Sequence, residues 1–147
     1  MDAPAGPDRS FLDANILFTA AYSHRSIVRR LWSFDPTEVI LITSGYAIGE
    51  GKQNLSPSAW EDLYAILHSV EVVSTPHSDA WILHPGIILP AKDEPVLQAA
   101  IAANASHLIT GDRRHFGAYF GQRIGSVLIL KPEMYRPDST GPPSVLS

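Results

Sequence analysis

The feature of this sequence that most constrains its fold is the alternation of short apolar runs with segments of helical periodicity. The apolar runs lie at residues 9–13, 38–43, 71–74, 107–110 and 126–130, and each has the length of one strand. Runs that are apolar at nearly every position are typical of parallel sheets with both faces covered, because such strands have no solvent side. The alternation therefore predicts an α/β fold around a parallel sheet.

The segments between these runs carry the spacing of helices, at residues 16–21, 26–32, 46–54, 58–69 and 94–105. Along 58–69 the apolar side chains recur at i, i+3, i+4 and i+7, which places them on one face of a helix. Along 26–32 the side chains predicted to face the core are Ile27, Val28, Leu31 and Trp32, with Arg29 and Arg30 outside. Residues 75–90, rich in proline and histidine, match no motif, so their role is not predicted.

The length of 147 residues suits a single domain with a sizeable core. We predict that this domain spans residues 10–136, between a flexible lead-in at 1–9 and a flexible tail at 137–147. The formal net charge of −4 argues against a generally basic nucleic-acid-binding protein, but it allows a locally basic groove.

Composition also excludes some chemistry and favours one location. The sequence has no cysteine, which excludes disulfides, thiolate nucleophiles and zinc sites built on cysteine. Its first residues lack the cationic segment and apolar stretch of a signal peptide, and its apolar runs are too short to span a membrane. We therefore expect a cytoplasmic protein.

Acidic residues stand where the predicted strands end. Asp13 ends the first run, Asp112 follows the fourth, Asp93 begins the helix before the fourth, and Glu50 lies on the helix after the second. In a parallel sheet these positions can converge at one edge. Carboxylates held together repel one another unless a cation binds, and oxygen ligands suit Mg²⁺ or Mn²⁺. Such an ion can activate water for attack on a phosphodiester.

Each of these residues also has a structural interpretation. Asp13, Asp93 and Asp112 can cap helices, and Glu50 can pair with Lys52 on the surface. The basic residues allow two interpretations as well: they can contact phosphates, or they can be solvated counter-ions of the carboxylates. They form two clusters, one of His24, Arg25, Arg29 and Arg30 and one of Arg113, Arg114 and His115.

Three segments and their order resemble the PIN-domain family of metal-dependent nucleases: FLDANIL, SGYAIGEGKQNL and KDEPVLQAAIAANASHLITGDRRHFG, followed by VLILKPEMY. Within that family the sequence is similar to the bacterial toxin-type, VapC-like ribonucleases, over about residues 10–136. The resemblance implies a three-layer α/β/α sandwich with a central parallel sheet, a Mg²⁺ or Mn²⁺ cofactor and an RNA substrate. It also implies a toxin–antitoxin system with a protein antitoxin as partner, and it is compatible with a homodimer.

The resemblance assigns roles to particular residues. The implied catalytic residues are Asp13, Glu50, Asp93 and Asp112, of which Asp13, Asp93 and Asp112 would hold the metal, with Asn15 and Thr110 supporting the site. One departure is the pair Gly49 and Gly51 around Glu50, because each glycine costs about 1 kcal/mol relative to alanine inside a helix. Glu50 is therefore expected to be the least rigid of the four acidic residues.

Other functions remain compatible with the same fold. One is a non-catalytic RNA-binding or protein-interaction module, and another is a structure-specific DNase with the same metal chemistry. A phosphatase is disfavoured, since Asn15 and not a second aspartate stands two places after Asp13, and no P-loop motif occurs. The aromatic residues Trp60, Tyr64 and Trp81 are candidates for a dimer interface, although for Trp60 and Tyr64 we favour a position in the core.

Overall fold

The computed structural model of the chain describes residues 6–137. Its strands are β1 (Asp8–Leu12), β2 (Val39–Ser44), β3 (Val70–Val73), β4 (His107–Ile109), β5 (Arg123–Ile124) and β6 (Val127–Leu130). Its α-helices are α1 (Ala14–Tyr22), α2 (Gly45–Asn54), α3 (Trp60–Leu67), α4 (Glu94–Ala102) and α5 (Arg113–Phe116). Short 3₁₀ helices are η1 (Ile27–Ser33), η2 (Pro57–Ala59), η3 (Ser78–Ala80), η4 (Gly117–Tyr119) and η5 (Pro132–Met134).

The predicted lead-in and tail fall mostly outside the described residues, at 1–5 and 138–147. The first strand nevertheless begins at Asp8, inside the predicted lead-in, where the Asp8 amide donates to the Glu38 carbonyl.

The six strands form one sheet in the order β3-β2-β1-β4-β6-β5. All neighbouring pairs are parallel except β5 and β6, which are antiparallel at one edge. From β1 the chain first builds outward to β2 and β3, and it later returns to the other side of β1 with β4. The neighbours β1 and β4 thus flank the point where the direction of winding changes, which is where open α/β sheets bind ligands.

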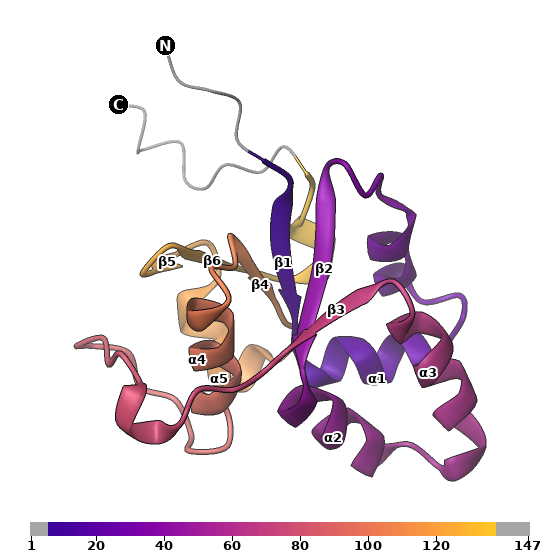
Figure 1. The fold of residues 1–147 in the computed structure, drawn as a ribbon, viewed down its shortest axis with the longest axis horizontal. Helices are drawn as coiled ribbons and strands as arrows, with labels where there is room; N and C mark the ends of the chain where they lie inside the picture. The colour runs from indigo at the N-terminus through magenta and orange to yellow at the C-terminus, as the bar shows by residue number, and fades with distance from the viewer. Residues whose placement is uncertain (1–5, 138–147) are drawn as a thin grey trace.

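Alternate side chains of the central strands enter two separate cores, one on each face of the sheet. Leu12 of β1 and Ile109 of β4 pack in the core under α1 and α3, whereas Phe11 and Leu108 pack in the core under α4 and α5. The helices accordingly lie on opposite sides of the sheet (Figure 1). This arrangement is the predicted three-layer α/β/α sandwich with a central, mostly parallel sheet.

One local prediction was wrong, and one short strand was missed. Residues 27–33 form a 3₁₀ helix, and Ile27, predicted to face the core, is 60% exposed. The two-residue strand β5 was not predicted, because a run of two residues has no periodicity to detect.

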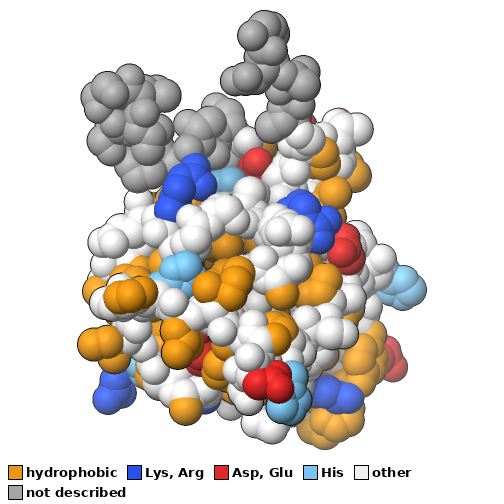
Figure 2. Space-filling view, turned by 60° about the vertical axis from the view of Figure 1, so that its left-hand side comes forward, with side chains coloured by type: hydrophobic (Ala, Val, Ile, Leu, Met, Phe, Trp, Pro, Cys, Tyr) orange, Lys and Arg blue, Asp and Glu red, His pale blue; other side chains and the backbone are white. Residues whose placement is uncertain are grey.

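The segment between β3 and α4 has little regular structure apart from η3. It is rich in hydrophobic side chains, and Ile82, Leu83 and Ile88 are exposed. The face of the molecule on which this segment comes forward carries several hydrophobic side chains between scattered charges (Figure 2). Among the described residues, no helix has both the length and the apolar character needed to cross a membrane.

Candidate functional site

Asp13 lies where β1 ends and α1 begins, and its carboxylate receives three hydrogen bonds. Oδ1 accepts from the Ala14 amide at 2.7 Å, while Oδ2 accepts from Asn15 Nδ2 at 3.0 Å and from Thr110 Oγ1 at 2.8 Å. Thr110, just after β4, also accepts from the Asp112 amide at 3.1 Å. We call Asp13, Asn15 and Thr110 the Asp13 corner. The helix-capping interpretation of Asp13 is therefore correct, and the same bonds tie the end of β1 to the end of β4.

Burial makes the Asp13 carboxyl a weaker acid than usual. Asp13 is only 3% exposed, and loss of hydration raises its pKa to about 6. The hydrogen bonds from Thr110 and Ala14 act in the opposite direction, and the nearby charges of Asp93 and Glu50 raise the pKa further. Asp13 thus interacts electrostatically with Asp93 and Glu50.

Asp93, Asp112 and His115 form a second group, which we call the Asp93 corner. The imidazole Nδ1 of His115 lies 2.8 Å from Asp112 Oδ2 and 2.9 Å from Asp93 Oδ2. Asp112 also caps α5, since its Oδ1 accepts from the His115 amide at 3.1 Å. Asp93 precedes α4 but makes no capping hydrogen bond, so the capping interpretation fails for this residue. Burial raises the pKa of Asp93, an effect that the charges of Lys92 and His115 partly offset.

Glu50 approaches from the opposite wall, on α2. A Cβ built on Gly51 would lie 3.2 Å from the Ala14 carbonyl oxygen, so the absence of a side chain at 51 lets α2 pack closely on the start of α1. A Cβ at Gly49, in contrast, would meet nothing within 4 Å. At least one of the two glycines therefore has a packing role, which is to bring the helix that carries Glu50 close to Asp13.

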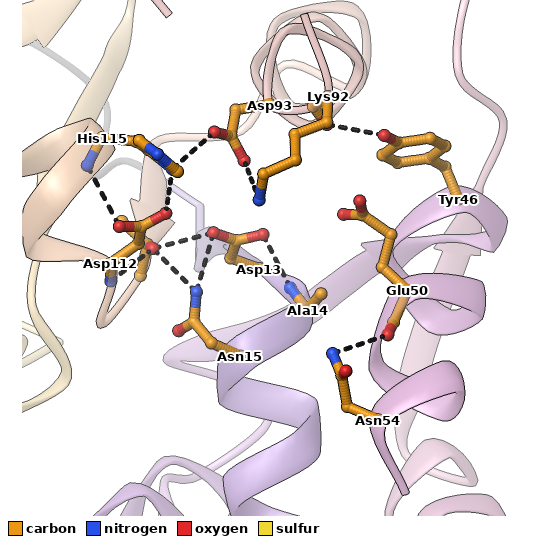
Figure 3. Close-up of polar contacts among 11 residues, drawn as sticks. Asp13, Ala14, Asn15, Tyr46, Glu50, Asn54, Lys92, Asp93, Asp112 and His115 are labelled. Carbon is orange, nitrogen blue, oxygen red and sulfur yellow. Dashed lines mark hydrogen bonds and ion pairs between the residues drawn. The ribbon is translucent and has the colours of Figure 1, made fainter. Parts of the chain in front are cut away.

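All four predicted acidic residues line one cleft with a volume of about 1000 Å³. Their side chains point toward a common space between α2, the start of α4 and α5, and the Lys92 ammonium group reaches into it (Figure 3). Lys92 Nζ lies 3.8 Å from Asp93 Oδ1. The structure thus brings together residues that are far apart in the sequence, as the positions at strand ends predicted.

The predicted cations separate into two pairs. Arg113 and Arg114 are exposed on α5, and Arg113 lines the cleft. Arg29 Nε instead donates to the Ala20 carbonyl at 2.7 Å, and Arg30 Nη2 donates to the carbonyls of Pro132 and Tyr135. Arg29 and Arg30 therefore hold the backbone together, a role that their positions in the sequence did not indicate.

Three residues that contact the acidic groups or their neighbours were not predicted in these roles: Lys92, Tyr46 and His115, of which His115 was predicted only as a phosphate contact. The Tyr46 hydroxyl donates to the Lys92 carbonyl at 2.6 Å, and burial, with the charge of Glu50, raises its pKa to about 12. His115 stands three positions after the capping residue Asp112, a helical spacing that could have identified it as a partner of that carboxylate.

The donor set of this cleft fits a divalent cation. Within residues 6–137, Asp93, Asp112 and His115 bring one ligand atom each to within 4.8 Å of one another. Asp93 Oδ2 is buried and makes no hydrogen bond, although His115 Nδ1 lies 2.9 Å from it. A cation at this position would provide the missing partner and reduce the repulsion among the carboxylates. Asp13 is not in this group, although its carboxylate faces the same space.

Comparison with known proteins gives a fold but no close relative. No family model matches the sequence, and no curated protein matches it either. Among solved structures, VapBC2 from Rickettsia felis bound to a DNA fragment matches with a TM-score of 0.61 and 16% identity, over 84% of this chain and 98% of the other.

Two further solved structures agree with this match. DNA-bound VapBC from Salmonella typhimurium gives a TM-score of 0.59 at 15% identity, over 85% of this chain and 98% of the other. VapC20 from Mycobacterium tuberculosis, described as a sarcin-ricin loop cleaving toxin, gives 0.54 at 16% identity, over 74% of this chain and 94% of the other. The chain therefore has the PIN-like α/β/α fold of VapC toxins, as predicted.

Proposed function

We propose that this protein is a metal-dependent endoribonuclease and the toxin of a toxin–antitoxin pair. The observation that carries the proposal is the convergence of Asp13, Glu50, Asp93 and Asp112 on one cleft, in a fold shared with a toxin that cleaves the sarcin-ricin loop. Fold alone does not determine function, so the proposal rests on the site and uses the fold as support.

In this proposal the acidic residues have different roles. Asp93 and Asp112 would hold a Mg²⁺ or Mn²⁺ ion, and Asp13 would add negative charge from a fixed position. Such an ion would strengthen water as a nucleophile and neutralise charge on the phosphodiester. Glu50, on the opposite wall, orients or deprotonates the attacking water. Asn15 and Thr110 keep the Asp13 carboxylate in one orientation through their hydrogen bonds.

The exposed cations of α5 supply contacts to the RNA backbone. Arg113 lines the cleft and Arg114 is exposed beside it, so both can reach phosphates next to the scissile bond. Such contacts contribute affinity without base specificity. We do not extend this role to Arg29 and Arg30, whose guanidinium groups are bound to backbone carbonyls.

The proposed partners are an RNA substrate and a protein antitoxin, and the proposed location is the cytoplasm. Two of the similar structures are VapBC assemblies bound to DNA. The exposed apolar side chains of Ile82, Leu83 and Ile88 support a protein partner, because exposed hydrophobic groups often mark interaction surfaces. As an alternative, we propose that a second copy of this chain binds this surface and forms a homodimer.

The test is cleavage of total cellular RNA by the purified chain with Mn²⁺, with Mg²⁺ and with EDTA. We expect the wild-type protein to cleave RNA with either ion and not with EDTA. We expect the Asp93→Asn variant not to cleave RNA under any of these conditions. Asp79→Asn is the matched control, since Asp79 is 83% exposed and does not line the cleft. Single-stranded DNA in a parallel assay separates a ribonuclease from a DNase. Absence of metal-dependent cutting of either nucleic acid, by a protein that binds Mn²⁺ normally, would favour a non-catalytic binding module.

A further inference from the structure

The position of His115 is determined by the same aspartate that its ring contacts. Asp112 caps α5 by accepting the His115 amide with Oδ1, and its Oδ2 lies 2.8 Å from the ring nitrogen Nδ1 of His115. The short helix α5 begins next to β4, and the buried side chain of Phe116 anchors it in the core. Backbone, carboxylate and core contacts therefore fix the position of the imidazole. A preorganised binding site requires side chains that are fixed in this way before the ligand binds.

Two carboxylate oxygens converge on this one nitrogen. Asp112 Oδ2 lies 2.8 Å and Asp93 Oδ2 lies 2.9 Å from Nδ1, but Nδ1 carries at most one hydrogen. The hydrogen bond goes to Asp112, and Asp93 Oδ2 remains buried without a donor. Since the Asp93 side chain is only 5% exposed, water cannot readily replace that donor. The ammonium group of Lys92 lies by the other oxygen, with Nζ 3.8 Å from Oδ1.

The three candidate ligand atoms converge on one small region. Both carboxylate oxygens lie beside the same nitrogen, at 2.8 and 2.9 Å, and all three atoms lie within 4.8 Å of one another. A cation among the three atoms would displace the hydrogen on Nδ1 and supply a partner to Asp93 Oδ2.

We propose that His115 is a direct nitrogen ligand of the divalent ion in this cleft, together with Asp93 and Asp112. The inference deepens the proposed function, on which it rests for the presence of the ion. An all-carboxylate site takes Mg²⁺ and Mn²⁺ alike, whereas an imidazole ligand favours a transition metal over Mg²⁺, which prefers oxygen. The ligand set therefore selects Mn²⁺ over Mg²⁺.

The experiment is pulsed electron paramagnetic resonance of the full chain with one equivalent of Mn²⁺, which detects the nuclear spin of a directly bound imidazole nitrogen. We expect an imidazole ¹⁴N coupling in the wild-type protein that changes to a ¹⁵N pattern when histidine is ¹⁵N-labelled. His115→Gln should lose it, whereas the control His77→Gln should keep it, because His77 is 83% exposed and its ring pairs with Asp79.

Calorimetry on the same proteins provides the second readout. We expect His115→Gln to weaken Mn²⁺ binding by about tenfold or more and to change Mg²⁺ binding much less, so that the preference for Mn²⁺ narrows. Mn²⁺ bound without imidazole coupling in the labelled wild-type protein overturns the proposal even if the variant does not fold. Failure of Mn²⁺ to bind at millimolar concentration overturns it too.

The two proposals fail in distinguishable ways. Metal-dependent RNA cleavage without nitrogen coupling leaves the nuclease function standing and removes His115 from the ligand set. Nitrogen coupling without cleavage of any nucleic acid leaves the ligand set standing and removes the nuclease function.

Discussion

The two corners of the acidic cleft differ in how completely the protein itself satisfies their carboxylates. In the Asp13 corner, three N–H and O–H donors serve one carboxylate. In the Asp93 corner, two carboxylates share one imidazole nitrogen, and one buried oxygen has no donor. In the Asp13 corner both carboxylate oxygens have hydrogen-bond donors from the protein itself, and these bonds join β1 to β4. In the Asp93 corner one carboxylate oxygen makes no hydrogen bond, so we expect ligand binding to depend chiefly on this corner.

Divalent-ion affinity should reveal this difference most strongly. We expect Asp93→Asn to weaken Mn²⁺ binding at least about 100-fold and Asp13→Asn only about tenfold, as is typical for supporting residues. Calorimetric titration of both variants measures the ratio. Equal losses would show that Asp13 is as much a ligand as Asp93, and the distinction between the corners would then be wrong.

The pH dependence of stability should distinguish the Asp13 corner in the metal-free protein. The folded-state pKa of Asp13 is about 6, above the ordinary value of 3.8. The folded state therefore holds this proton more tightly, and the stability associated with it is present below pH 3.8 and lost as the pH rises through 6.

The asparagine variant isolates this contribution. Relative to Asp13→Asn, the wild-type free energy of unfolding in EDTA should fall by up to about 3 kcal/mol between pH 4 and pH 7. Urea denaturation of both proteins across this range measures the difference. A difference that stays constant with pH would contradict the raised pKa.

Removal of the Thr110 hydroxyl should destabilise the Asp13 corner. Thr110→Val keeps the shape of the side chain but removes a group that bonds Asp13, Asn15 and the Asp112 amide, so we expect a loss of about 1–3 kcal/mol. Thr37→Val is the matched control, because the exposed Thr37 hydroxyl also donates to an aspartate, at 2.8 Å, and should cost about 0.5 kcal/mol or less. Equal losses in urea denaturation would mean that the buried network has no special stability.

The smallest effect is expected at the two glycines beside Glu50. Gly49→Ala should raise the free energy of unfolding by about 0.5–1 kcal/mol, because the new methyl meets nothing and alanine favours the helix. Gly51→Ala should not raise the free energy of unfolding in this way, since its methyl group would lie too close to the Ala14 carbonyl oxygen. Thermal denaturation of the two variants makes the comparison, and an equal gain in both would show that α1 and α2 have room to separate.

The fold could be predicted largely because its central strands β1, β2, β4 and β6 are mostly buried on both faces. The runs around Phe11, Ile42 and Leu108 are apolar at consecutive positions, and the structure uses those positions for two cores. Residues 27–33 were assigned to an α-helix because a 3₁₀ helix has no separate hydrophobic signature. The roles of Arg29 and Arg30 could not be predicted, since their carbonyl partners at Ala20, Pro132 and Tyr135 are set by tertiary contacts.

The site was predictable to the extent that it follows from strand topology. Asp13 and Asp112 follow neighbouring parallel strands, so their convergence could be expected. The difference in hydrogen bonding between the two corners could not be expected, because the partners of each carboxylate depend on side-chain orientation and burial. Asp13 and Asp93 are both aspartates before a helix, yet only Asp13 caps its helix.

The long separation between the paired strands also governs when this site can exist during protein synthesis. Asp13 and Thr110, which share a hydrogen bond, are 97 positions apart in the chain. A ribosome that adds about 5–20 residues per second makes them roughly 5–20 s apart. Until β4 emerges, the nascent chain has neither Thr110 to hold Asp13 nor the neighbouring strand beside β1. A growing chain therefore carries no assembled cleft for most of its time on the ribosome.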